Sequence, residues 1–455
     1  MMHAADTICA PATSAGTGAI AVIRVSGPDA LAAVDRVVAF RSGTAAAAKG
    51  YTIKFGNAAG LDDVLVSIFR APRSYTGEDA AEISCHASPY IVGALLDKLT
   101  EAGCRLAEPG EFTRRAYVNG KMDLAQAEAV ADVIAASSAA QHRVAMNQLR
   151  GGYSAELRGL RAQLLELTSL LELELDFSEE DVEFADRSRL RALLDTACSH
   201  CRQLADSFRL GNAIKNGVPV AIVGAPNSGK STLLNALLRD DRAIVSDIPG
   251  TTRDTVEETC VIGGVLFRFI DTAGIREASD EVERLGIERT FRKIGEAEIV
   301  LGVVDASMPQ EAVSAAISEI AGRVDASRQK LLILLNKADK ADGPLSCHSE
   351  RSEESVLRIS AKHGAGLDEL RAALAARAGV ASATGTLVTN ARHAAALREA
   401  AASLAAVSDG LDRGIPSDLL AEDLRAALTS LGTITGLITT DEVLGEIFSK
   451  FCIGK

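Results

Sequence analysis

Short apolar runs alternate with amphipathic stretches in the N-terminal part of the chain. Residues 18–27, 64–69 and 81–85 have the apolar, β-branched composition of strands. Residues 28–38 and 89–99 place apolar side chains three and four positions apart, which is the spacing of an amphipathic helix. This alternation predicts an α+β domain at the N-terminus.

The pattern changes after residue 123. Up to about residue 210 the chain is rich in Ala and Leu, has almost no Pro, and repeats apolar side chains at helical spacing. The same pattern returns at residues 389–407 and 417–431. We therefore predict one all-α domain whose two parts are separated in the sequence.

Strand-like runs mark the region between those two helical parts. Residues 218–223, 267–270 and 331–335 are short and apolar, and a polar or Gly-containing segment follows each of them. Strands that alternate with longer segments are typical of an α/β domain. The changes of pattern predict four segments, which are residues 1–120, 121–216, 217–379 and 380–455. Residues 346–355 are charged and of low complexity, which predicts a surface loop.

Composition limits the class of protein. The 455 residues are too many for one ordinary core, and 47% hydrophobic with 24% charged residues is typical of a soluble globular chain. We recognise neither a signal peptide nor a membrane-spanning run, and eight scattered cysteines fit a reducing, cytoplasmic location. Cys198 and Cys201 lie in a helical stretch, which favours packing over a metal site.

The formal net charge of −13 argues against nucleic-acid binding through a broad basic surface. Neutralising many phosphates requires clustered Lys and Arg. A local basic patch, or a partner that carries the basic surface, remains compatible with this charge.

A phosphate-binding loop is the first chemical motif. Residues 224–231 read GAPNSGKS and match the pattern G-x-x-x-x-G-K-[ST], between the strand at 218–223 and a helix that starts at Thr232. Backbone N–H groups of such a loop surround a phosphate, Lys230 reaches the outer phosphates, and the Ser231 hydroxyl binds Mg²⁺. Alone, the loop indicates only a nucleoside triphosphate and leaves an ATPase open.

Three further segments indicate guanine. Residues 271–274 (DTAG) follow a strand and serve the metal's water shell and the γ-phosphate. Asp339, in the segment NKAD, can accept from both the ring N–H and the amino group of guanine, a donor pair that adenine lacks. The segment SAK offers a backbone N–H to the guanine oxygen. The predicted contacts are Asn227, Ser228, Gly229, Lys230, Ser231, Thr232, Asp271, Thr272, Ala273, Gly274, Asn336, Lys337, Ala338, Asp339, Ser360, Ala361 and Lys362.

These motifs belong to a wider set that spans the chain. The set comprises DTI at 6–8, GED at 77–79, PGEFT at 109–113, DLAQAEA at 123–129 and FCIGK at 451–455. Together with the inserted nucleotide domain and its helical flanks, it resembles the bacterial and organellar tRNA wobble-uridine modification GTPases, the MnmE or TrmE family. The C-terminal pentapeptide is the most specific of these segments.

The resemblance implies a multidomain α+β and α/β fold. Its parts are a folate-binding-like N-terminal domain that forms a homodimer, an all-α central domain, and an inserted Ras-like P-loop GTPase domain. It implies a potassium-activated GTPase that hydrolyses GTP to GDP and phosphate. With an FAD-dependent partner (MnmG or GidA), as a heterotetramer, such a protein adds a carboxymethylaminomethyl or aminomethyl group to C5 of the tRNA wobble uridine. The carbon comes from a tetrahydrofolate derivative, and glycine and ammonium both remain open as the nitrogen source.

A folate site is also implied by the resemblance. Its residues are Arg24, Glu82, Lys121 and Lys455, with Cys452 as a possible further member, and its ligand is methylene- or formyl-tetrahydrofolate. Without the family, we prefer a domain that serves only dimerisation, in which Arg24 is an exposed strand residue and Glu82 is half of an ordinary surface pair. For Cys452, the alternative to a functional role is that of a packed or site-lining side chain.

The hydrolytic residues are the least evident from the sequence. Ile275 stands where many related GTPases carry a water-orienting glutamine, and its side chain cannot hold a water. The resemblance assigns that role to Glu283, whereas the residues alone leave Asp280 and Glu281 equally open. It also places K⁺ on Asn227, Ser246, Ile248 and Thr251, and Mg²⁺ on Ser231 and Thr252. The implied GTP contacts of this switch segment are Ser246, Asp247, Ile248, Pro249, Gly250, Thr251 and Thr252.

A second class of function stays open at this point. A GTPase switch of the ribosome-assembly type shares the nucleotide motifs but performs no tRNA chemistry. Such proteins lack the folate-type N-terminal domain and the FCIGK tail, and they commonly carry a basic appendage that the charge of −13 does not suggest.

Overall fold

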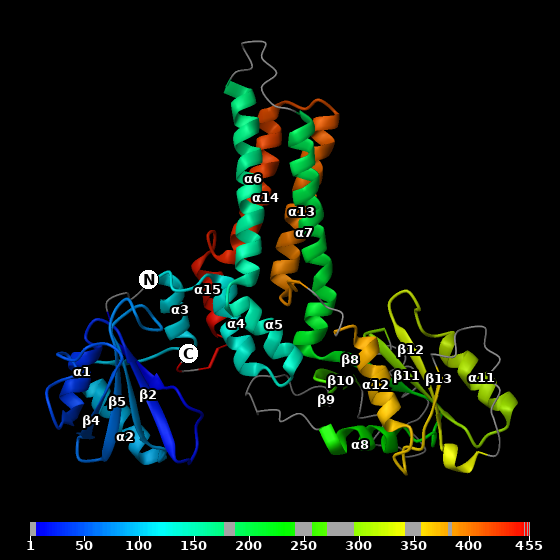
Figure 1. Ribbon diagram of the computed structural model, residues 1–455, viewed down its shortest axis with the longest axis horizontal. Coiled ribbons are helices and arrows are strands. Elements are labelled where there is room, and N and C mark those ends of the chain that lie inside the picture. The colour runs from blue at the N-terminus through cyan, green and yellow to red at the C-terminus, as the bar shows by residue number, and fades with distance from the viewer. Residues whose placement is uncertain are drawn as a thin grey trace. The chain divides into compact units, whose positions relative to one another are not determined.

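The computed structural model describes residues 6–176, 187–241, 257–270, 295–341, 356–380, 385–449, 451, 452 and 454 (Figure 1). The chain divides into two compact units. The first comprises residues 1–131, 154–158 and 429–455, and the second comprises residues 132–153 and 159–428. The four predicted segment boundaries stay a prediction.

A seven-stranded sheet forms the centre of the first unit. Its order is β3-β4-β5-β6-β2-β1-β7, and its neighbours are antiparallel except for the parallel pair β1 and β7. The strands are β1 (Ile8–Pro11), β2 (Ile20–Ser26), β3 (Val38–Phe40), β4 (Thr52–Ala58), β5 (Asp62–Phe69), β6 (Ala80–His86) and β7 (Arg105–Leu106).

Two helices cover one face of this sheet. Helices α1 (Ala30–Val37) and α2 (Pro89–Glu101) pack on β2 and β6 over a buried cluster that includes Ile23, Ile83 and Leu95. The predicted strands at β2, β5 and β6 and both predicted helices are confirmed. The sequence patterns missed β4, because its alternate side chains face an uncovered part of the sheet and its composition is therefore mixed.

The other face is partly covered by the C-terminal end of the chain. Helix α3 (Glu111–Val118) places Phe112 against Ile8 and Ala10 of β1. Helix α15 (Asp441–Ser449) packs on α3, and the ring centres of Phe448 and Phe451 lie 5.4 Å apart in a tilted arrangement. Residues from the two ends of the sequence therefore share one layer.

Long helices open the second unit. Helix α7 (Arg187–Asn216) packs along α13 (Ala391–Asp412), so the two separated helical stretches form one domain, as predicted. Cys198 and Cys201 are buried in α7, which fits a packing role. Helix α5 (Ala139–Leu149) also belongs to this unit, whereas α4 (Leu124–Ala135), α6 (Gly152–Asp176) and α14 (Ser417–Thr435) have residues assigned to both units.

The inserted domain has a six-stranded sheet of order β13-β12-β11-β8-β10-β9, parallel except for β9. Its strands are β8 (Val218–Val223), β9 (Glu258–Ile262), β10 (Val265–Ile270), β11 (Ile299–Asp305), β12 (Lys330–Asn336) and β13 (Val356–Arg358). Described helices of this domain are α8 (Lys230–Asp241), α11 (Gln310–Ala321) and α12 (Leu367–Ala378). The three predicted strands are confirmed as β8, β10 and β12.

Helix α5 fixes both connections of the inserted domain. Gln141 and Gln148 lie two turns apart on α5 and are buried, and they donate to the carbonyls of Lys215 at 2.8 Å and Leu387 at 3.1 Å. These carbonyls belong to the segments that enter and leave the domain. None of the helices in the described part of the chain has the length and apolar content needed to cross a membrane.

Candidate functional site

The phosphate loop joins β8 to α8 in a conformation that requires glycine. Gly224 and Gly229 have φ of +153° and +99°, and a Cβ at either position would collide, with the Val303 carbonyl and with the Asn336 amide respectively. Asn227 also has positive φ, at +59°, and its side chain is exposed. The loop is therefore tightly curled at the N-terminus of α8, the geometry that binds an anion.

Lys230 begins the helix that follows the loop. Its Nζ donates to the carbonyls of Gly224 at 2.8 Å and Ala225 at 2.9 Å. The ammonium thus lies over the loop entrance, within reach of the outer phosphates of a bound nucleotide. Ser228 is buried beneath it, and Ser231 is half-buried in the first turn of α8.

Asn336 connects the phosphate loop to both base-recognition segments. It is 3% exposed, and its Nδ2 donates to the Ser228 carbonyl at 2.8 Å. Its Oδ1 accepts from the backbone N–H of Ala361 at 3.0 Å. One buried amide therefore joins its own segment to a segment 108 positions away and to another 25 positions away.

Asp339 is the residue that the sequence predicts to contact guanine. Its Oδ1 accepts from the Ser360 hydroxyl at 2.5 Å, and His363 lies 3.7 Å from its Oδ2. The Ser360 hydrogen bond holds the pKa of Asp339 below its usual value. An ionised carboxylate with one oxygen facing solvent can accept from two donors on a base edge.

The segment at 360–362 offers backbone N–H donors. Because the Ala361 N–H already bonds to Asn336, the N–H of Lys362 is the other candidate for the guanine oxygen, and it has no partner within the described ranges. The remaining predicted contacts lie outside the described residues: Ser246, Asp247, Ile248, Pro249, Gly250, Thr251, Thr252, Asp271, Thr272, Ala273, Gly274 and the predicted catalytic Glu283.

A second group of predicted residues meets in the first unit. Arg24 on β2 faces Glu82 on β6 in the sheet register, and its Nε and Nη2 bind Glu82 Oε1 at 3.0 and 2.8 Å. The guanidinium also lies 5.2 Å from the ring centre of Tyr75 and 5.6 Å from that of Phe112. The Arg24 side chain is only 17% exposed, so Arg24 is not the exposed strand residue that the residues alone favoured.

The C-terminal tail reaches this arginine. Arg24 Nη1 donates to the Gly454 carbonyl at 3.3 Å, and the buried Gly454 lies against Pro11 of β1. Phe451 is buried, whereas Cys452 is exposed and accepts a backbone hydrogen bond from Gly110 at 3.4 Å. The tail is therefore docked, and the Cys452 side chain is not packed in a core.

The other two predicted folate residues are less constrained. Lys121 is exposed, and its Nζ donates at 2.9 Å to the carbonyl of Pro72, at the start of the loop that carries Tyr75. Lys455 lies outside the described residues.

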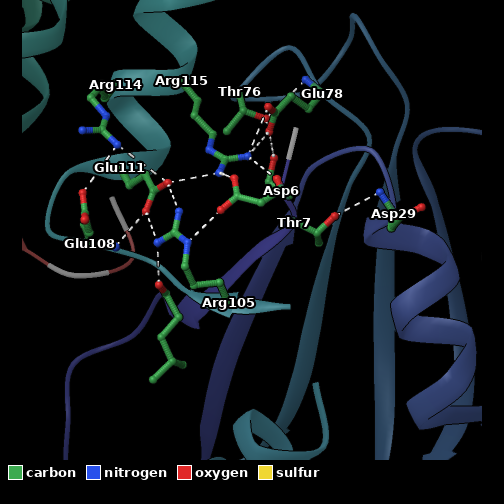
Figure 2. A network of polar contacts seen from close by, with 12 residues as sticks. Asp6, Thr7, Asp29, Thr76, Glu78, Arg105, Glu108, Glu111, Arg114 and Arg115 are labelled. Atoms are coloured by element: carbon green, nitrogen blue, oxygen red, sulfur yellow. Dashed lines mark hydrogen bonds and ion pairs between the residues drawn. The ribbon is translucent and has the colours of Figure 1, made fainter. Parts of the chain in front are cut away.

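A network of ion pairs holds α3 in place (Figure 2). The sequence patterns predicted no role for it. Glu111 is 2% exposed and accepts from Arg105 at 2.6 Å and Arg115 at 3.0 Å, and Arg115 continues to Asp6 at 2.6 Å. Burial alone would raise the pKa of Glu111, but the hydrogen bonds from Arg105 and from the Glu108 N–H hold it below its usual value.

Because it holds α3, the network also fixes side chains that surround Arg24. Helix α3 also carries Phe112, whose ring faces that guanidinium, and Thr113, whose hydroxyl lies 2.8 Å from the Tyr75 hydroxyl. The sequence marked the segments 6–8, 77–79 and 109–113 as family motifs, and three members of the network belong to them.

Comparison with known proteins gives these sites a context. Residues 7–121 match the family model described as the GTP-binding protein TrmE N-terminus, and residues 124–452 match the MnmE helical domain. The tRNA modification GTPase MnmE of Bacteroides thetaiotaomicron is 51% identical over 467 residues, which cover 99% of both chains. The chain belongs to the MnmE family of tRNA modification GTPases.

A second relative agrees with this membership. The protein of the same name from Porphyromonas gingivalis is 51% identical and covers 99% of this chain and 98% of its own. Among solved structures, the G domain of the T. maritima FeoB iron transporter is 24% identical, with a TM-score of 0.24, and covers 35% of this chain and 98% of that domain. The resemblance drawn from the motifs and the predicted fold class are confirmed.

Proposed function

We propose that this chain hydrolyses GTP and that its GTPase cycle serves the modification of the wobble uridine of tRNA. Membership in the MnmE family supports the tRNA role over the ribosome-assembly alternative. The observation that carries the nucleotide assignment is the buried Asn336, which joins the phosphate loop to the loop that holds Asp339. A carboxylate fixed at that place selects guanine over adenine.

We infer the metal ligands from the family, and the described residues among them are compatible with cation binding. Asn227 carries an exposed amide at positive φ that has no hydrogen-bond partner in the described part of the chain, so it is available to a cation. With Ser246, Ile248 and Thr251 it would hold K⁺, which supplies positive charge beside the transferring phosphoryl group. Ser231 and Thr252 would hold Mg²⁺ through their hydroxyls. Glu283 would orient the attacking water.

Potassium dependence is a direct test of this assignment. Turnover of GTP should rise when sodium is replaced by potassium, and the gain should vanish in Asn227→Ala. Glu283→Ala should keep GTP affinity and lower turnover on the order of 10²-fold. Equal rates in the two salts would contradict the proposed cation site.

The first unit fits a tetrahydrofolate derivative. Arg24, held by Glu82 and two aromatic rings, presents a guanidinium beside the docked tail. With Lys121 and Lys455 it would bring cations to the carboxylates of a folate, and Cys452 is exposed at the same tail. The bound folate supplies the one-carbon unit, and these residues bind and orient it.

The uncovered part of the same sheet supports a homodimer. Phe55 on β4 and Leu65 on β5 face each other in register and are 36% and 49% exposed, and Ile53 next to them is 68% exposed. Tyr51, just before β4, lies on the same side of the sheet and is 69% exposed. A contiguous apolar face of this kind favours association with a second copy. Sedimentation of the parent and of Phe55→Lys tests this, and an unchanged sedimentation coefficient would contradict it.

We further propose an FAD-dependent partner of the MnmG type, in a heterotetramer that acts on tRNA. The experiment is expression of the chain in a bacterium that lacks its own gene for this function, followed by nucleoside analysis of the tRNA. Restored modification at C5 of the wobble uridine, together with co-purification of a flavoprotein, is the expected result. GTP hydrolysis without restored modification would favour the ribosome-assembly alternative.

A further inference from the structure

Asp305 lies at the edge of the sheet where the guanine-recognition segment begins. It is the last residue of β11 and pairs in register with Asn336, the last residue of β12. The next N–H in the chain, that of Ala306, donates to the Asn336 carbonyl at 2.8 Å. Because both strands are parallel, their carboxyl ends place Asp305 beside the first residues of NKAD.

Both oxygens of the Asp305 carboxylate are occupied. Oδ2 lies 2.6 Å from the Nζ of Lys337, and Oδ1 accepts from the N–H of Ser307 at 3.0 Å and from its hydroxyl at 2.6 Å. Burial would raise the pKa of Asp305, but the Lys337 and Ser307 hydrogen bonds lower it below its usual value. The carboxylate is therefore an anion in a fixed orientation, directed at Lys337.

Lys337 itself sits in a constrained backbone position. Its φ and ψ are 63° and 33°, the left-handed region that a residue other than glycine rarely adopts. It stands between Asn336 and the 3-10 turn η1 (Ala338–Lys340) that carries Asp339. Asn336 is held by Ser228, Asp339 by Ser360, and Lys337 by Asp305, so each polar side chain of the segment has its own partner.

We propose that Asp305 is a positioning residue for guanine-nucleotide binding and that it acts through Lys337. This inference rests on the proposed GTP site. A free lysine side chain populates many rotamers, and ordering it on binding costs affinity. An ammonium anchored on Asp305 has already lost that freedom before the nucleotide arrives.

An ordinary ion pair is the competing interpretation. The two side chains are 31% and 18% exposed, and a pair of this exposure can exist without any effect on a ligand. The two interpretations differ in what a substitution changes. Loss of an ordinary pair alters only the unfolding transition, whereas loss of a positioning contact alters nucleotide affinity and leaves turnover at saturating GTP unchanged.

The chain contains a matched control. Asp325 Oδ1 accepts from the N–H of Ser327 at 3.0 Å and from its hydroxyl at 2.6 Å, the same arrangement as in Asp305 and Ser307. No lysine contacts Asp325 in the part of the chain that the structure describes, and Asp325 precedes β12, whose other end carries the first residue of NKAD. Asp325→Asn therefore removes a carboxylate from the same kind of turn and leaves the proposed nucleotide site unchanged.

The experiment measures dissociation of a fluorescent GDP analogue from the full chain. We expect dissociation to be about fivefold faster in Asp305→Asn, the size of a partly buried ion pair, and unchanged in Asp325→Asn. In a Lys337→Met background, Asp305→Asn should add nothing, because the two residues act as one unit. The ratio of affinities for GTP and ITP should stay that of the parent, because Asp339 reads the amino group that ITP lacks.

Several results would overturn the inference. The inference would be wrong if Asp305→Asn released GDP at the parental rate or bound it more tightly. It would also be wrong if Asp305→Asn kept its full effect in the Lys337→Met background. If Asp305→Asn does not fold, as judged by its thermal melt, Ser307→Ala takes its place, and dissociation as slow as in the parent would count against the proposal. Absence of GDP binding by the parent itself would instead overturn the proposed function.

Discussion

The side-chain amide of Asn336 donates to the backbone carbonyl of Ser228 at 2.8 Å, inside the sheet edge where the phosphate and base segments meet. This bond lies directly beside Gly229, whose missing side chain leaves the space for it. Phosphate binding and base recognition are thus held by one buried contact between residues 108 positions apart. The geometry of one segment depends on the other.

Gly229→Ala should therefore abolish nucleotide binding. A Cβ at this position would collide with the Asn336 amide, and alanine also disfavours the φ of +99°. Gly379→Ala is the control, because Gly379 also has positive φ, at +69°, but a Cβ there meets nothing within 4 Å. Titration with a fluorescent GDP analogue measures the difference, and equal affinity in the two variants would contradict the predicted collision at Gly229.

Asp339→Asn should move the preference from GTP toward xanthosine triphosphate. In the proposed site the carboxylate of Asp339 would accept from the guanine amino group, whereas an amide can donate to the oxygen that xanthine carries there. Competition between the two nucleotides measures this preference, with Asp368→Asn on the exposed start of α12 as a control. A variant that still prefers GTP as strongly as the parent would remove Asp339 from the role of base reader.

Glu111→Gln should destabilise the first unit by about 3 kcal/mol at neutral pH, because it leaves Arg105 and Arg115 without a buried anion. The pKa of Glu111 is lower in the folded chain than its ordinary value of 4.5, so its stabilisation is complete above that value. It is lost as the pH falls through the folded pKa.

Urea unfolding of parent and variant at pH 7 and below pH 4.5 checks this prediction. The difference in the free energy of unfolding should shrink at the lower pH. Glu101→Gln is the control, since Glu101 pairs with Lys98 on the exposed side of α2, and it should change stability little. A difference that is independent of pH would assign the effect to packing.

Removal of residues 452–455 should abolish tRNA modification and leave GTP binding near that of the parent. The truncation removes the Gly454 carbonyl that Arg24 binds, together with Lys455. Calorimetry with a reduced folate is the direct measurement, and unchanged folate affinity would leave the tail with a structural role only.

Gly454→Ala is a milder form of the same test. Its φ is +94°, and a Cβ would meet the Pro11 carbonyl, so the tail should detach while the rest of the chain stays intact. Gly414→Ala is the matched control, because its φ is +67° and its surroundings are open. We expect weaker folate binding in Gly454→Ala only.

The amino-acid sequence by itself determined the elements and motifs that depend on neighbours along the chain. The loop at 224–231 and the segment at 336–339 could be predicted because glycine spacing and a preceding apolar strand set their conformation locally. The separated halves of the helical domain followed from composition and period. The family resemblance added the pairing of Arg24 with the tail, which no local pattern contains.

Only the tertiary structure decided which distant residues meet. Asp305 gave no signal in the sequence, because its role depends on the register of β11 with β12. The exposure of Arg24 could not be predicted either, since α3, the Glu111 network and the tail cover it from segments up to 430 residues away. Such contacts arise when apolar faces pack and bring buried charges together, and burial then demands that each charge be paired. Packing therefore fixed the partners, whereas the sequence pattern determined the elements that carry them.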